Sequence, residues 1–224
     1  MIDLLQGLLD ILLHIDEKLA QWIAEYKTGT YLILFLIVFV ETGLIIMPLL
    51  PGDSLLFTAG MFCSVENPTL KIEIVIPLLI FAALLGDNVN YFTGRFFGDQ
   101  IKKRKRILFF KREYIEMTEA FYAKHGGKTI IMARFVPIVR TIAPFVAGAG
   151  SMTYSRYILF CILGAILWVG SITTLGYLFG NIPIVRNNFT IAILAIIFIS
   201  IIPILVGLMK GWLTKRKSAP EDIS

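Results

Sequence analysis

Two acidic and two basic side chains lie within apolar stretches of this sequence. Glu41 interrupts a long apolar run, Asp53 follows a Pro-Gly pair further on, and Arg134 and Arg140 bracket the apolar residues 135–139. A charged side chain at bilayer depth costs about 2.5–3.5 kcal/mol on insertion scales, so a chain that keeps four of them is expected to use them. Two acids and two bases therefore predict a site that handles charge inside a membrane.

The composition is that of a membrane protein. The chain has 224 residues, of which 57% are hydrophobic, and no long polar or low-complexity stretch divides it. A soluble domain cannot bury this much apolar surface, so we predict an all-α integral membrane protein with one membrane domain. The net charge of +5 is concentrated in clusters such as 102–106 and 215–217, each of which follows a hydrophobic segment. This placement is typical of cytoplasmic anchors and argues against a nucleic-acid partner.

Prolines and glycines break two of the hydrophobic segments. Pro48, Pro51 and Gly52 interrupt the first, and Pro137 and Pro144 interrupt a later one. Because proline stops a helix and unwound backbone needs a cavity, each segment is predicted to form a re-entrant helix-break-helix hairpin.

The remaining segments follow from helical periodicity and hydropathy. Apolar residues three or four apart over 4–26 predict an amphipathic helix at the membrane interface. The predicted division is an amphipathic interfacial helix (1–28), a membrane domain (29–212) and a cytoplasmic tail (213–224). Within the membrane domain we predict a re-entrant hairpin (31–62), a spanning helix (72–94), a basic interfacial segment expected to be helical (99–128), a second re-entrant hairpin (129–150) and two spanning helices (154–178 and 188–210).

Two short motifs recur in the same order, which indicates an internal repeat. Residues 57–60 (Phe-Thr-Ala-Gly) match residues 145–148 (Phe-Val-Ala-Gly), and the glycines of 93–98 match those of 175–180. A unit of one returning hairpin and one spanning helix crosses the membrane an odd number of times, so the second copy must be inverted. The predicted fold is an inverted repeat of this unit with an extra C-terminal transmembrane helix.

The basic clusters orient this arrangement. Placing residues 102–106 and 215–217 on the cytoplasmic side puts the C-terminus in the cytoplasm. The side of the N-terminus depends on residues 31–50: if they span rather than return, the N-terminus lies in the cytoplasm.

Each candidate residue has a functional interpretation and a purely structural one. Glu41 is expected to couple protons, or else to be a protonated group hydrogen-bonded to a neighbouring helix; Asp53 couples protons or caps the helix that begins at Ser54. Arg134 and Arg140 are expected to bind substrate, because the planar arginine fork suits phosphate, or else extend to phosphates at the membrane surface. Secondary candidates lie on one predicted helix, namely Asp87 and Arg95.

Enzyme motifs are absent from the sequence. Residues 126–129 resemble the end of a phosphate loop, but the glycine that such a loop needs four residues earlier is missing. No G-x-S-x-G or H-E-x-x-H pattern occurs. Cys63 and Cys161 are isolated, as are the two histidines, so we predict no metal site, no cofactor and no enzyme.

Several motifs together resemble the DedA family of bacterial inner-membrane proteins, within the VTT-domain superfamily. The resemblance covers about residues 4–210. It is carried by Phe39-Val40-Glu41-Thr42-Gly43, Leu50-Pro51-Gly52-Asp53-Ser54, Gly94-Arg95-Phe96-Phe97-Gly98, Lys124-His125-Gly126-Gly127-Lys128-Thr129-Ile130-Ile131 and Ala133-Arg134-Phe135-Val136-Pro137-Ile138-Val139-Arg140-Thr141.

The resemblance implies that the protein moves lipids between leaflets. By this resemblance, the family's essential acidic pair corresponds to Glu41 and Asp53, and its essential arginine pair corresponds to Arg134 and Arg140. The implied cargo is undecaprenyl phosphate, with coupling to the proton-motive force in some members. The alternatives are a passive phosphatidylethanolamine scramblase, a proton-coupled ion or drug antiporter, and a structural scaffold. Expected partners are membrane phospholipids, polyprenyl phosphate and protons, and an oligomer is compatible with the sequence.

Overall fold

A computed structural model describes residues 15–44, 52–64, 69–103, 106–107, 110–111, 126–150, 152–180 and 182. These residues form helices, apart from one antiparallel pair of two-residue strands, β1 (Arg106–Ile107) and β2 (Phe110–Lys111). Three stretches are long and apolar enough to cross a membrane: Glu17–Gly43, Ile72–Phe97 and Tyr154–Gly180. The prediction of a helical membrane protein is therefore confirmed.

The first of these stretches is made of three consecutive elements. Helix α2 (Ile15–Tyr26), the 3-10 turn η1 (Lys27–Gly29) and α3 (Thr30–Gly43) follow one another without a gap. Leu19 is fully buried in the core, and Trp22 and Ile23 pack against the same core cluster. Residues 17–26, predicted to lie at the interface, belong to the first candidate span. Residues 1–14, which complete the predicted interfacial helix, lie outside the described residues.

Helix α3 ends where the sequence predicts a break. The backbone at Leu44 is extended, and α4 (Gly52–Cys63) begins two residues before the predicted start at Ser54, so Asp53 lies inside its first turn. A side chain at Gly52 would displace the Glu41 carboxylate, so glycine there leaves room for this carboxylate at the start of α4.

Helix α5 (Ile72–Lys103) is longer than the predicted span of 72–94. The glycines near its end do not stop it, and it continues into the basic region as far as Lys103. Within the segment predicted to be helical (99–128), residues 99–103 are helical as the end of α5, whereas residues 106–107 and 110–111 form β1 and β2.

A second break separates α7 (Lys128–Arg134) from α8 (Pro137–Ala149). Val136 is extended, as expected for a residue before proline, and Pro137 stands at the first position of α8. Pro144, inside α8, has no N–H to donate to the carbonyl of Arg140 four residues earlier. Pro144 thus leaves the carbonyl of Arg140, one of the predicted site residues, without its helical partner.

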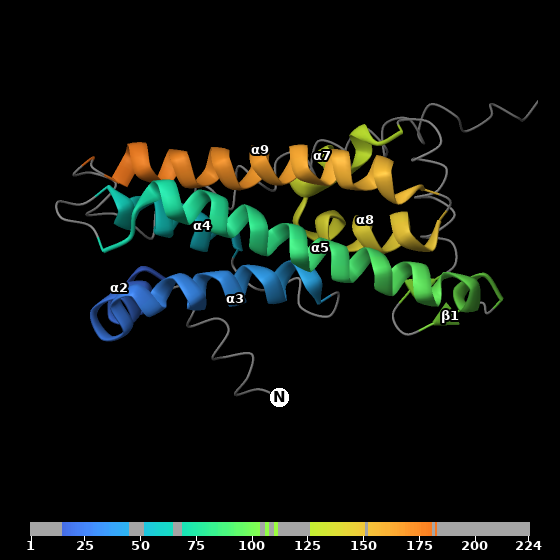
Figure 1. The fold of residues 1–224 in the computed structure, drawn as a ribbon, viewed down its shortest axis with the longest axis horizontal. Helices are drawn as coiled ribbons and strands as arrows, with labels where there is room; N and C mark the ends of the chain where they lie inside the picture. Colours follow the sequence, from blue (N-terminus) through green and yellow to red (C-terminus); the bar gives the residue numbers. More distant parts are fainter. Residues whose placement is uncertain are drawn as a thin grey trace, which may run out of the picture.

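The long helices lie side by side and run roughly along one direction (Figure 1). Helix α9 (Tyr154–Gly180) runs opposite to its neighbour α5. Helix α4 packs mainly against α9, and α8 mainly against α5. Helix α3 also packs on α5, and α7 on α9. Each broken pair of helices therefore contacts both long helices.

The repeated motifs lie at matching contacts between these helices. Side chains at Gly60 and Gly176 would collide with the backbone of α9 and α4, respectively. Side chains at Gly148 and Gly94 would likewise collide with the backbone of α5 and α8. Glycine is needed at all four positions because two pairs of helices approach closely there.

Further predicted elements lie outside the described residues. These are residues 112–125 of the basic segment, the spanning helix at 188–210 and the tail at 213–224.

Candidate functional site

The four charged residues singled out in the sequence all lie at ends of broken helices. Glu41 is in the last turn of α3, Asp53 in the first turn of α4, Arg134 is the last residue of α7 and Arg140 is in the first turn of α8. A helix stabilises an acid at its N-terminus and a base at its C-terminus, which favours Asp53 and Arg134. Glu41 and Arg140 oppose the dipoles of their own helices, so they depend on partners from other helices.

Arg140 is held by both predicted acids. Its Nη1 donates to Oδ1 of Asp53 at 2.7 Å, and its Nη2 donates to Oε1 of Glu41. The Glu41 side chain is 1% exposed and that of Arg140 is 9% exposed. Asp53 is 15% exposed, so this three-residue group joins α3, α4 and α8 through charged bonds that are largely shielded from solvent, where such bonds are stronger than at a surface.

Trp168 of α9 completes this group. Its indole Nε1 donates to the same Oδ1 of Asp53 at 2.9 Å, and its ring lies 4.9 Å from the guanidinium carbon of Arg140. This geometry combines a hydrogen bond with a cation–π contact.

Arg134 pairs with a third acid, Asp87 of α5. Its Nη2 donates to Oδ2 of Asp87, and both side chains are about 5–6% exposed. Cys161 lies beside the pair, with its sulfur 3.3 Å from both Nη2 and Oδ2. The hydroxyl of Tyr157 donates to the backbone carbonyl of Asp87 at 2.9 Å, which fixes this part of α5 against α9.

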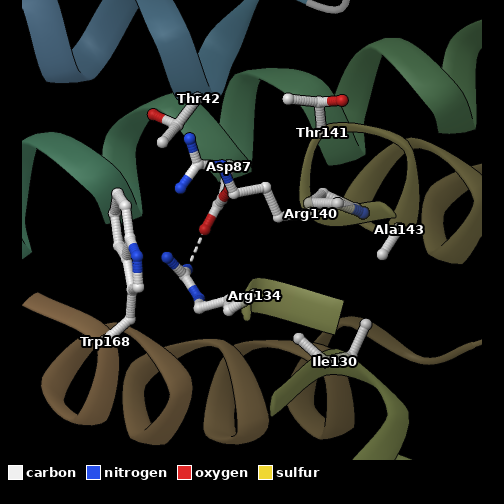
Figure 2. Close-up of a pocket in the computed structure, with 9 residues that line it drawn as sticks. Thr42, Asp87, Ile130, Arg134, Arg140, Thr141, Ala143 and Trp168 are labelled. Carbon is white, nitrogen blue, oxygen red and sulfur yellow. Dashed lines mark hydrogen bonds and ion pairs between the residues drawn. The ribbon is translucent and has the colours of Figure 1, made fainter. Parts of the chain in front are cut away.

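The two groups of charges meet at a small cavity (Figure 2). The figure shows both guanidinium groups beside the Trp168 ring, with Asp87 reaching Arg134 from α5. The cavity has a volume of about 10 Å³, which is close to the space that one water molecule needs. A phosphate group cannot enter unless these side chains move apart, so this arrangement is closed.

The site has more acids than bases among its paired residues. Two guanidinium groups (Arg134 and Arg140) face three carboxylates (Glu41, Asp53 and Asp87). Within the described part of the chain, Oε2 of Glu41 and Nε of both arginines are buried without a hydrogen-bond partner. One proton bound to the group would balance its charge, and the unpartnered oxygen of Glu41 is a place for it.

Asn90 ties the surrounding helices together. Its Nδ2 donates to the carbonyl of Thr141 in α8 at 2.6 Å and lies 3.5 Å from the carbonyl of Thr42 in α3. Because Asn90 belongs to α5, one buried amide links the helices that carry Glu41, Asp87 and Arg140.

The structure brings together five of the six candidate residues and separates one. Arg134 is paired with Asp87 and not with the acids expected to oppose it. Arg95 is exposed, and its Nη1 lies 3.3 Å from the hydroxyl of Tyr91, away from the group. No three His, Cys, Asp or Glu side chains of the described ranges are arranged to hold a metal ion.

Sequence reasoning missed Trp168, Tyr157 and the contacts of Cys161. All three occur in an apolar helix, where their types give no functional signal. An indole or phenol buried among apolar residues needs an acceptor for its N–H or O–H. This requirement is the one sequence signal that could have indicated Trp168 and Tyr157 as partners of the site.

Taken together, the fold and the site define a helical membrane protein with a buried group of ion pairs at the breaks of its helices. Residues 50–178 match the VTT domain. The chain is 49% identical to Protein DedA of Escherichia coli K12, covering 93% of this chain and 95% of that protein. It is 42% identical to an uncharacterized membrane protein of Mycobacterium leprae, covering 84% and 83%. Inner membrane protein YqjA of Escherichia coli K12 is 32% identical, covering 74% and 78%.

The chain belongs to the DedA family. No solved structure matches it. Two of these three names describe membrane proteins, and none of the three states a transported substrate.

Proposed function

We propose that this protein moves a lipid phosphate, with undecaprenyl phosphate as the best candidate, between the leaflets of the bacterial inner membrane. The observation that carries the proposal is the pair of buried guanidinium groups, which lie side by side at the helix breaks and contact carboxylates, Trp168 and, for Arg134, the sulfur of Cys161.

A phosphate can replace the carboxylates on chemical grounds. Arginine binds two oxygens of a carboxylate or a phosphate through the same planar fork. Arg140 makes charged bonds to Glu41 and Asp53 through two different nitrogens. A phosphate monoester offers three oxygens and up to two negative charges, so it can satisfy Arg140 and still reach Arg134.

Proton binding to the acids causes Arg140 to exchange its carboxylate partners for phosphate. Protonation of Glu41 or Asp53 weakens the hold of that acid on Arg140 and leaves the arginine available for phosphate. Loss of the proton restores the acid, which then competes with the phosphate and releases it. The surplus of one carboxylate supports this cycle, because the closed group already has a place for one proton. Transport is thus coupled to the proton-motive force.

The architecture that suits this cycle is an inverted repeat of two re-entrant hairpins, α3–α4 and α7–α8, each followed by a long helix. The packing of α4 on α9 and of α8 on α5, together with the four matched glycine contacts, supports it. Alternating access then consists of movement of one repeat against the other around the charged group. In this proposal the C-terminus faces the cytoplasm, and the protein transports its substrate without chemical conversion.

The test is leaflet exchange of labelled undecaprenyl phosphate in proteoliposomes with and without a pH gradient. We compare the wild type with Arg140→Ala and with Arg156→Ala, a matched control because Arg156 is exposed on α9. We expect exchange that responds to the gradient in the wild type and the control, and that is lost in Arg140→Ala.

Other outcomes contradict the proposal in distinct ways. Exchange that needs Arg140 but ignores the gradient indicates a passive scramblase and removes the proton coupling. Proton-linked flux of an ion or drug in vesicles that contain no lipid phosphate indicates an antiporter. Equal exchange in all three proteins means that Arg140 does not carry the substrate.

A further inference from the structure

Trp168 contacts both parts of the charged site although it carries no charge itself. Its ring lies 4.9 Å from the guanidinium carbon of Arg140 and 6.0 Å from that of Arg134. Its N–H donates to Asp53 at 2.9 Å, and the side chain is among the largest that are fully buried. The residue that contacts both arginines is therefore also bonded to one of their acids.

We infer that Trp168 is a positioning residue that couples the two arginines of the site. This inference rests on the proposed function and deepens it. Two guanidinium groups repel each other, and the negative face of an indole ring attracts both, most strongly where water is excluded. The ring thus holds Arg134 and Arg140 close enough to act on one phosphate.

The indole N–H has a second effect, because it fixes the resting place of Asp53. Oδ1 of Asp53 accepts from Trp168 and from Arg140 at the same time. A phosphate that displaces Asp53 from Arg140 must disturb the indole bond as well. The state of Trp168 therefore follows the occupation of the arginines.

Two substitutions separate the ring from its N–H. Trp168→Phe keeps a ring face and removes the donor, whereas Trp168→Leu removes both. We expect Trp168→Leu to raise the half-saturating concentration of undecaprenyl phosphate about tenfold, the equivalent of about 1.4 kcal/mol, and Trp168→Phe to raise it less than about threefold. A tryptophan that only fills space predicts a lower maximal rate in both variants with no change in the half-saturating concentration.

A fluorescence measurement tests the same contacts without transport. The chain has three tryptophans, and Trp22→Phe with Trp212→Phe leaves Trp168 as the only indole. In this background we expect Arg134→Lys and Arg140→Lys each to change the emission of Trp168, because lysine keeps the charge but loses the planar group. The exposed control Arg156→Lys should leave the emission unchanged.

The two measurements distinguish this inference from the proposed function. Emission that responds to both arginines, without transport of lipid phosphate by the wild type, supports the contacts and refutes the function. Normal transport with an unchanged half-saturating concentration in Trp168→Leu refutes the positioning role and leaves the function standing. The fluorescence measurement keeps Trp168 in place, so it does not depend on whether Trp168→Leu folds. If the emission of Trp168 is unchanged in both arginine variants, the inference is overturned.

Discussion

Asp87 is predicted to be the residue whose neutralisation destabilises the protein most among the three acids of the site. It is the one carboxylate paired with Arg134 in the described part of the chain, whereas Arg140 has two. Both members of the Asp87–Arg134 pair are about 5–6% exposed, so the pair belongs with buried ion pairs and not with surface ones. Removing one partner of a buried pair leaves an uncompensated charge, at a cost of about 3–5 kcal/mol.

The substitution Asp87→Asn keeps the shape of the side chain and removes only its charge. The expected loss of about 3–5 kcal/mol corresponds to a fall in Tm of roughly 6–20 °C for a chain of this size. Asp53→Asn is expected to cost only about 1.5–3 kcal/mol, since Glu41 still holds Arg140. The assay is thermal unfolding of the purified proteins in one detergent.

The double variant Asp87→Asn with Arg134→Gln tests whether the loss of stability comes from the unpaired charge and not from the changed side-chain shape. It removes both charges, so its stability should return to within about 1–2 kcal/mol of the wild type. The reasoning is refuted if Asp87→Asn costs less than about 1 kcal/mol, or if the double variant is no more stable than the worse single variant.

Three further predictions concern the packing around the site. Gly148→Ala should destabilise the protein by about 1–3 kcal/mol in thermal unfolding, because the added side chain would meet the Tyr91 carbonyl. The control Gly170→Ala has open space around it and should be neutral or slightly stabilising. Equal effects of the two substitutions would contradict the close approach of the helices at Gly148. Asn90→Leu should cost about 1–3 kcal/mol in the same assay through the unpaired carbonyl of Thr141, and wild-type stability would show that this bond is not needed. Cys63 and Cys161 are buried, so maleimide labelling followed by mass spectrometry should be slow in the folded protein and fast after denaturation; rapid labelling of the folded protein would show that the core is open.

The sequence was sufficient to predict much of the site because charges in apolar surroundings are rare. Glu41, Asp53 and Arg140 stand out for that reason alone, and the structure brings them into direct contact. Helix breaks at Pro51-Gly52 and Pro137 were equally visible, since proline restricts the backbone wherever it occurs.

The partners of Arg134 could not be predicted in the same way. Asp87 lies in the middle of a long helix, and its contact with Arg134 depends on the rotation of α5 toward α7 and α9. Hydrophobic periodicity places a residue on a face of its own helix but does not fix which helix lies opposite. Trp168 was missed for a related reason, because an aromatic residue in an apolar helix packs in a core far more often than it supports a charge.

The end of α5 shows a different limit. Hydropathy predicted its end at residue 94, where the apolar run stops, but hydrogen bonding continues to Lys103. Helix propensity and membrane boundary are separate properties, and lysine and arginine are good helix formers. The strand pair that follows depends on only two residues on each side, which is too short a pattern to recognise.

The central claim is that the buried arginines recognise the phosphate of a lipid. Its most direct test compares leaflet exchange of undecaprenyl phosphate, undecaprenol and phosphatidylethanolamine in the same proteoliposomes. We predict protein-dependent exchange of undecaprenyl phosphate that is far faster than that of undecaprenol, with phosphatidylethanolamine also slow. Equal rates for undecaprenyl phosphate and undecaprenol would contradict the account, because the two lipids differ only in the group that Arg134 and Arg140 are proposed to bind.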